Sequence, residues 1–191
     1  MPLDRHARRF LDMLAAAGHS RGRYDDVQDR RAALVNLADM VDPPGTVEIG
    51  GVRDLLMPVA NRDGSAGHIT LRLYSPLGLP ERALPGMLFF HGGGWVAGSL
   101  ETHDGLCRRL ANETGCRVIA VDYRLAPEHP FPFGLADAVA ALAYVRRHAR
   151  EFGIDPARLG VAGDSAGGTL AAVLCRVARD AAGENGQAPS I

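Results

Sequence analysis

The sequence predicts an α/β fold, in which a doubly wound, mostly parallel sheet has helices between its strands. Three uninterrupted apolar runs, at residues 87–90, 118–121 and 159–162, are typical of parallel strands buried on both faces. Helical stretches at about residues 103–113 and 134–151 separate them, and such strand–helix alternation defines the class. Binding loops in these sheets lie at the carboxyl ends of the strands, where we expect the functional residues.

Two helices are expected at the N-terminus. Residues 4–17 carry apolar side chains at helical spacing, and glycines within residues 18–22 end that helix. A second helix opens at residues 25–26, both aspartates, and the prolines at 43–44 end it. These helices precede the predicted core.

A β-hairpin is expected next. Its strands are residues 46–59 and 68–74, and residues 61–65 supply the turn. A connector rich in proline and glycine, residues 76–86, leads to the first apolar run. Residues 182–187 are expected to form a loop at the end of the chain.

Composition restricts the class of protein. The chain has 191 residues, 47% of them hydrophobic, which suits one domain with a core, and its net charge of −1 gives no reason to expect nucleic acid or an anionic membrane as partner. Cys107, Cys116 and Cys175 lack metal-ligand spacing, so we expect free thiols and no metal site. Asp12 interrupts the only candidate signal sequence, and no apolar run could span a membrane. A soluble, cytoplasmic protein is the expectation.

A nucleophile motif surrounds Ser165. The strand expected at residues 159–162 runs into Gly163-Asp164-Ser165-Ala166-Gly167, and a helical stretch follows. This is G-x-S-x-G in a strand–turn–helix context, where a serine nucleophile stands on a very tight turn. Gly163 and Gly167 remove Cβ atoms that would collide there. We expect the Ala166 N–H, at the start of the helix, to stabilise an oxyanion.

A glycine-rich loop, His91-Gly92-Gly93-Gly94-Trp95, follows the first apolar run. Glycines let backbone N–H groups face a cleft without obstruction, and the tetrahedral intermediate of acyl transfer needs such donors. We therefore expect Gly92 and Gly93 to complete the oxyanion hole with Ala166, while His91 and Gly94 support the loop.

The same loop permits a second interpretation. Gly92, Gly94 and Ala97 spell G-x-G-x-x-A after a strand, and Asp122 closes the next strand, as in a dinucleotide-binding domain of an oxidoreductase. Against this, Gly98 and the serine after it interrupt the chain where a fingerprint helix should already have begun. A phosphate-binding loop fits less well, because no lysine precedes that serine.

Three segments together resemble a known family. HGGGW (91–95), DYRLAPEHPFP (122–132) and GDSAGG (163–168) are similar to signature stretches of the hormone-sensitive-lipase-like (GDXG) branch of the α/β-hydrolases, over roughly residues 25–182. The resemblance implies the N-terminal portion of an α/β-hydrolase fold and a serine esterase or lipase that uses no metal or cofactor. It also implies short- to medium-chain esters as small-molecule substrates.

The resemblance also suggests a division of the chain. Residues 1–44 would hold N-terminal helices of a cap over the active site, and residues 45–191 a partial core that ends after the nucleophile-elbow helix. The alternative is that the N-terminal helices simply cover one edge of the core.

Several side chains near the motifs have competing roles. His91 is a structural residue by resemblance, although its imidazole is also a candidate base; the chain order of serine, acid, histidine in this fold argues against the base. Asp164 is expected to buttress the elbow, and Asp122 and Glu128 to make local hydrogen bonds in a proline-rich loop. Trp95 either lines an acyl pocket or fills the core.

The catalytic acid and histidine of the family have no matching positions here. No histidine follows Ser165, and the only carboxylates beyond it are Asp180 and Glu184. Asp180 is fifteen residues along the same helix, about 20 Å away. The strand at 159–162 is then expected to form an apolar edge of the sheet.

Three interpretations follow from this. In the first, the chain is the N-terminal part of a serine ester hydrolase whose remainder is lost or lies on a complementing C-terminal chain, so that it is inactive alone and active when complemented. In the second, it is a non-catalytic small-molecule-binding member of the fold. The third, least in keeping with the motifs, is a dinucleotide-binding domain of an oxidoreductase. A homo-oligomer is compatible with each of them.

Overall fold

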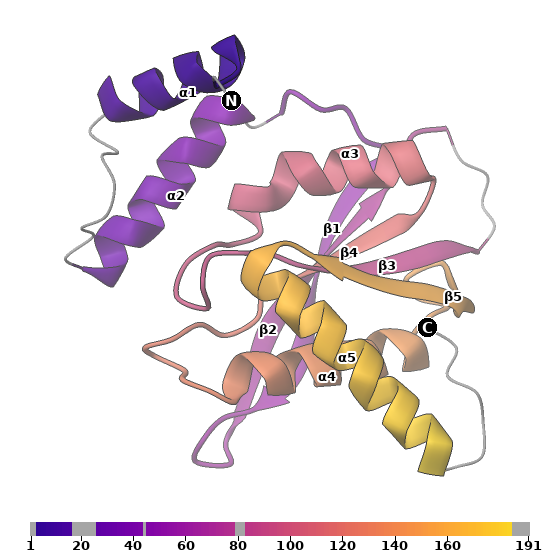
Figure 1. The fold of residues 1–191 in the computed structure, drawn as a ribbon. Helices are drawn as coiled ribbons and strands as arrows, with labels where there is room; N and C mark the ends of the chain where they lie inside the picture. Colours follow the sequence, from indigo (N-terminus) through magenta and orange to yellow (C-terminus); the bar gives the residue numbers. More distant parts are fainter. Residues whose placement is uncertain (1–2, 17–25, 44, 79–82, 185–191) are drawn as a thin grey trace.

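A computed structural model describes residues 3–16, 26–43, 45–78 and 83–184 of the protein (Figure 1). Its strands are β1 (Gly51–Ala60), β2 (Ala66–Ser75), β3 (Leu84–Phe90), β4 (Arg117–Val121) and β5 (Ile154–Gly163). Its helices are α1 (Arg5–Ala16), α2 (Val27–Val41), α3 (Asp104–Thr114), α4 (Phe133–Arg147) and α5 (Ser165–Glu184), with a short 3-10 helix, η1 (Glu101–His103), before α3. Among these helices, none combines the length and apolarity needed to cross a lipid bilayer.

The described strands form one mixed sheet in the order β1-β2-β4-β3-β5. β3 runs parallel to both β4 and β5, while the β1–β2 hairpin adds antiparallel to β4. The carboxyl ends of β3, β4 and β5 therefore point to the same edge of the sheet. This confirms the predicted α/β class and the hairpin.

Helices cover both faces of the sheet, and alternate residues of β3 show why. Phe89 packs in a cluster with Cys107 and Ala111 of α3, whereas its neighbours Leu88 and Phe90 pack in the larger cluster that includes α4 and α5. Figure 1 shows α3 on one face and α4 with α5 on the other. The two-sided apolar character of β3 follows from this arrangement.

Burial on both faces was predicted for all three apolar runs, and it is wrong for the third. β3 and β4 are largely buried, but residues 160–163 of β5 are only half-buried. Within the described residues β5 pairs with β3 alone, so it is the edge strand that the sequence led us to expect.

Some predicted boundaries also differ. The hairpin's first strand begins at Gly51 rather than at residue 46, and α4 ends at Arg147, because residues 148–153 form turns that close when the Ile154 N–H bonds the Ala149 carbonyl. α5 continues to Glu184, so a loop at 182–184 is wrong. The predicted break at 18–22, the proline at 44 and the loop residues 185–187 lie outside the described residues.

A buried ion pair fixes the chain after β4. Asp137 of α4 is 1% exposed and accepts hydrogen bonds from the Arg124 backbone N–H (2.9 Å) and from its guanidinium (2.5 Å at Nη2). Arg124 also donates to the Ala60 carbonyl at the end of β1, and its guanidinium lies 4.6 Å from the centre of the Phe133 ring. One carboxylate thus joins α4, the hairpin and the segment that follows β4.

We predict that Asp137→Ala lowers the free energy of unfolding by roughly 3 kcal/mol, because it leaves the Arg124 guanidinium buried without its counter-charge. Urea denaturation measures the change. The control is Asp155→Ala, which removes a partly exposed carboxylate paired with the exposed Arg158 and should shift the urea midpoint far less. Equal shifts in the two variants would contradict a structural role for the buried pair.

Candidate active site

Ser165 lies where β5 turns sharply into α5. Its φ of +49° is in the left-handed region, which a non-glycine residue adopts only when its surroundings hold it there. A Cβ on Gly167 would collide with the Phe90 carbonyl at the end of β3, and one on Gly163 would lie 2.5 Å from the same oxygen. The two glycines therefore allow the elbow to rest against β3, as the motif predicted.

The glycine loop after β3 is tied to this elbow by Asp164. The Gly92 N–H donates a 2.8 Å hydrogen bond to Asp164 Oδ1, across 72 positions of sequence. The expectation that Gly92 supplies an oxyanion donor is therefore wrong, because its N–H is already engaged. Asp164 buttresses the site as expected, although its partner lies in the neighbouring loop rather than in the elbow itself.

Other N–H groups remain available beside Ser165. The loop doubles back so tightly that the Ala97 N–H bonds the Gly93 carbonyl, and Gly93 and Gly94 have φ values of +128° and +64°. Within the described ranges, neither Gly93 nor Gly94 donates a backbone hydrogen bond, and Ala166 is in the first turn of α5, where N–H groups lack helical partners. Three donors, two from the glycine loop and one from the first turn of α5, thus lie at one edge of the sheet.

This geometry contradicts the dinucleotide interpretation. No helix begins within residues 92–97, since the chain turns there and continues through η1 before α3 starts at Asp104. The N–H of Gly92, which a fingerprint would turn toward pyrophosphate, instead faces the carboxylate of Asp164.

His91 is part of the scaffold of the loop. Its side chain is 2% exposed, its Nδ1 lies 2.8 Å from the Gly92 carbonyl, and its ring stacks on Tyr123 with 4.4 Å between centroids. The Tyr123 hydroxyl in turn donates to the His91 carbonyl at 2.7 Å. Because the Gly92 carbonyl can only accept a hydrogen bond, the His91 proton must lie on Nδ1. The other ring nitrogen, Nε2, has no partner among the described residues. These contacts favour the structural role over that of a base.

His103 extends the same network. Its Nε2 lies 3.1 Å from Asp164 Oδ1, the oxygen that also receives the Gly92 N–H, and its Nδ1 lies 2.8 Å from the Thr102 hydroxyl. Burial lowers the pKa of the His103 imidazole, and the neighbouring Asp164 carboxylate opposes that shift. The elbow, the glycine loop and the start of α3 therefore share one carboxylate.

Arg31 of α2 joins a second set of loops. It donates to the Val96 carbonyl (2.8 Å), to the Ala126 carbonyl (3.2 Å) and to both oxygens of Glu128 (2.8 and 2.7 Å). These hydrogen bonds lower the pKa of the Glu128 carboxyl to about 2, so the pair stays charged at any ordinary pH. The prediction that Glu128 makes only local contacts is wrong, because its partner lies 97 positions away.

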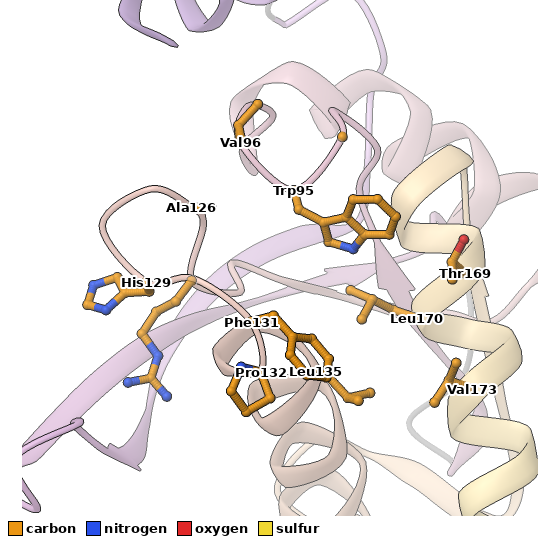
Figure 2. A pocket seen from close by; sticks show the side chains of 13 residues that line it. Trp95, Val96, Ala126, His129, Phe131, Pro132, Leu135, Thr169, Leu170 and Val173 are labelled. Carbon is orange, nitrogen blue, oxygen red and sulfur yellow. The ribbon is translucent and has the colours of Figure 1, made fainter.

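An apolar pocket of about 460 Å³ opens beside the elbow (Figure 2). Thr169 and Val173 line it from α5, and their spacing of four and eight residues from Ser165 places all three on one helix face. Trp95 and Phe131 line it from the two loops, with Trp95 47% exposed. Of the two roles considered for Trp95, the pocket wall is the one its position supports.

Similarity to known proteins identifies the family. Residues 87–189, more than half of the chain, match a family described by the alpha/beta hydrolase fold. The chain belongs to the α/β-hydrolase family. Its sequence is similar to the esterase LipI of Mycobacterium tuberculosis, with 53% identity over 122 residues that cover 63% of this chain and 38% of LipI. It is also similar to the carboxylic ester hydrolase LipN of the same organism, with 45% identity over 159 residues, 83% of this chain and 40% of LipN.

A solved structure shares the architecture of this α/β-hydrolase chain. It is a hyperthermophilic esterase from the archaeon Pyrobaculum calidifontis, 40% identical with a TM-score of 0.85, and the match covers 99% of this chain and 56% of that one. The chain spans about two fifths of the length of the two curated relatives.

The sequence did not reveal the residues that connect the loops of this α/β-hydrolase. Arg31 lies in a predicted helix, and nothing local distinguishes it from Arg30 beside it. His103 lies at the start of the helical stretch predicted at residues 103–113, and nothing local indicates a role in the site, yet it contacts the carboxylate next to Ser165. A signal for such pairs exists only in three dimensions, because their partners are distant along the chain.

We predict an acid-sensitive stability from His91. Burial lowers the pKa of its imidazole from 6.5 to about 4, so between these pH values the unfolded chain binds more protons than the folded one. The free energy of unfolding should fall as the pH drops from 6.5 to 4, by roughly 3 kcal/mol for this group at the full shift. His103, shifted in the same direction, adds to the effect.

His91→Asn tests this, because the amide Nδ2 can still donate to the Gly92 carbonyl but does not titrate. Urea unfolding at several pH values should show a flatter dependence between pH 4 and 6.5 in this variant. His68→Asn, at an exposed position of β2, should keep the wild-type slope. Identical slopes in His91→Asn and wild type would refute the assignment.

We predict that Arg31→Met, which keeps the aliphatic stem and removes the guanidinium, loosens α2. Hydrogen bonds from a charged group are each worth about 1.5–3 kcal/mol, so amide exchange of α2 and of the Ala97 N–H should accelerate by about tenfold or more. Hydrogen-exchange mass spectrometry measures the rates. Arg30→Met, on the same helix but with no side-chain hydrogen bond to a described residue, is the matched control and should exchange like wild type.

Proposed function

We propose that the protein is a serine carboxylic ester hydrolase that works through an acyl-enzyme at Ser165. The observation that carries the proposal is the convergence of a strained serine, three available N–H donors and an apolar pocket on one edge of the sheet. Acyl transfer from an ester requires a serine nucleophile, N–H donors for the oxyanion and a pocket for the substrate, together with a base. The esterase relatives LipI and LipN support the same conclusion.

In this mechanism the Ser165 hydroxyl attacks the ester carbonyl, and its proton passes to a base. The N–H groups of Gly93, Gly94 and Ala166 stabilise the negative charge that develops on the carbonyl oxygen. The intermediate expels the alcohol and leaves an acyl group on Ser165, and water then hydrolyses that ester. Asp164 and His91 act by positioning, since they hold the loop that carries two of the three donors.

The pocket indicates the class of ester. Its walls are mainly apolar, with Trp95, Phe131 and Leu170 among them, and about 460 Å³ accommodates a short- to medium-length acyl or alcohol group. We infer such esters as substrates. We also infer that α1 and α2 form part of a cap, because Arg31 links α2 to the two loops that border the pocket.

The base that accepts the Ser165 proton is not among the contacts of this serine in the described part of the chain. Within the described residues the Ser165 hydroxyl makes no hydrogen bond to a histidine, and we assign neither the catalytic acid nor the base to a residue of this chain. A complementing chain is one source of the imidazole that the proposal allows. The same observation favours a second candidate function, a non-catalytic protein that binds a small ligand in the pocket.

We predict that a fluorophosphonate probe labels Ser165 in the natively purified protein, because phosphonylation needs a serine activated by a base. Intact-mass spectrometry detects the adduct and peptide mapping places it. Ser165→Ala should abolish labelling and ester hydrolysis with the fold intact, whereas Ser99→Ala, a serine in the neighbouring loop, should leave both unchanged. A folded protein that binds an ester analogue saturably but is never labelled would favour the non-catalytic function.

A further inference from the structure

A second pocket lies at the opposite edge of the sheet from Ser165. It encloses about 350 Å³ and is lined by three arginines, Arg53 of β1, Arg117 of β4 and Arg150 in the turn after α4. The lining also includes Ser75 and one acidic residue, Glu151. Three positive charges therefore face a cavity in which a single carboxylate opposes them.

Arg117 lacks the counter-charge that comparable arginines have. The side chains of Arg72, Arg108 and Arg124 are 17%, 20% and 11% exposed, and each contacts a carboxylate within 2.7 Å. Arg117 is also half-buried, yet it forms no ion pair with any described residue. The other described arginines for which no ion pair is found are all exposed to solvent. Partial burial of an unpaired charge is costly, so its missing partner needs an explanation.

The hydrogen bonds of Arg117 are also incomplete. Its Nη1 donates to the Ser75 hydroxyl at 3.1 Å, but its Nε is buried and has no partner among the described residues. The guanidinium lies against Gly153, whose φ of +62° and missing side chain leave room for it; a Cβ there would lie 2.9 Å from Arg117 Cζ. The Arg117 guanidinium is thus held in place, although at least one of its N–H groups, at Nε, has no acceptor among the described residues.

The other two arginines add positive charge. Arg53 donates from Nη2 to the Glu151 backbone carbonyl at 2.9 Å, which leaves the Glu151 carboxylate uninvolved, and neither Arg53 nor Arg150 forms an ion pair within the described part of the chain. Burial lowers the pKa of the Arg117 guanidinium, and the charge of Arg53 lowers it further. The like charges repel one another, and a bound anion would relieve that repulsion.

We propose that this pocket is a binding site for a small phosphate-bearing ligand, held by Arg117, Arg53 and Arg150. Three guanidinium groups and one carboxylate leave a charge of about +2, which a phosphate dianion balances and a monocarboxylate does not. Guanidinium groups bind phosphate oxygens in a two-pronged geometry, and a volume of about 350 Å³ suits a small phosphate-bearing molecule.

The site is independent of the proposed ester hydrolysis. Arg117 is the first residue of β4 and Val121 the last, so the pocket and the catalytic edge are separated by about 13 Å along that strand. No residue of the glycine loop or the elbow lines it. Binding there can be measured whether or not Ser165 is active.

Isothermal titration calorimetry at constant ionic strength tests the site, with inorganic phosphate, glycerol 3-phosphate and acetate as ligands. We expect saturable binding of one phosphate per chain and at least tenfold weaker binding of acetate. If glycerol 3-phosphate binds more tightly than phosphate, the pocket also contacts the organic group. If the two bind equally, the pocket recognises the phosphate oxygens alone. Both results support the site.

Substitutions locate the binding. Arg117→Gln should weaken phosphate binding by about tenfold or more, and the exposed Arg53→Gln and Arg150→Gln, which do not disturb buried packing, should each weaken it measurably. Arg62→Gln, at the tip of the β1–β2 hairpin, is the control and should bind as wild type. Absence of saturable phosphate binding, acetate binding as tight as phosphate, or equal affinities in the pocket variants and Arg62→Gln would overturn the proposal.

Discussion

The candidate active site depends on the close approach of the first turn of α5 to the end of β3. The Phe90 carbonyl lies where side chains on Gly163 and Gly167 would otherwise be, so only glycines at these positions let the helix start against the strand. Ser165 then accepts a strained φ of +49°, because the strand on one side and the helix on the other fix its backbone. The exposure of the serine follows from that contact.

A second layer of contacts holds the loops around the elbow. Asp164 receives the Gly92 N–H and lies beside His103, while Arg31 holds the carbonyls of Val96 and Ala126 from the other side. The contacts of Asp164 with Gly92 and of Arg31 with the two carbonyls each pair a charged side chain with a backbone group, and such hydrogen bonds are stronger than neutral ones. The loops are thus held partly by each other, through Gly92 and Asp164, and partly by Arg31 of α2 and His103 of η1.

The fold and the nucleophile motif could be predicted from sequence because their signals are local. Apolar runs, helical spacing and glycines around Ser165 each act within a few residues, and the structure has the strands, helices and elbow where they indicated. The failures share a different cause. The Gly92 donor and the local role of Glu128 were wrong because Asp164 and Arg31, which engage them, lie 72 and 97 positions away. β5 is likewise only half-buried because it lies at the edge of the sheet, and the sequence of the strand itself does not predict that position.

The hydrogen bond between Gly92 and Asp164 has a consequence for how this scaffold can change. It joins the loop after β3 to the elbow after β5, so a shift of either segment alone would break it. Substitutions in the two segments should then be strongly non-additive, as expected for residues that share a partner. If only one of the two segments were replaced by that of a relative, we expect the Gly92–Asp164 hydrogen bond to be lost, whereas replacing both segments together should preserve it. The two segments therefore behave as one structural unit, although 72 positions separate the residues that join them.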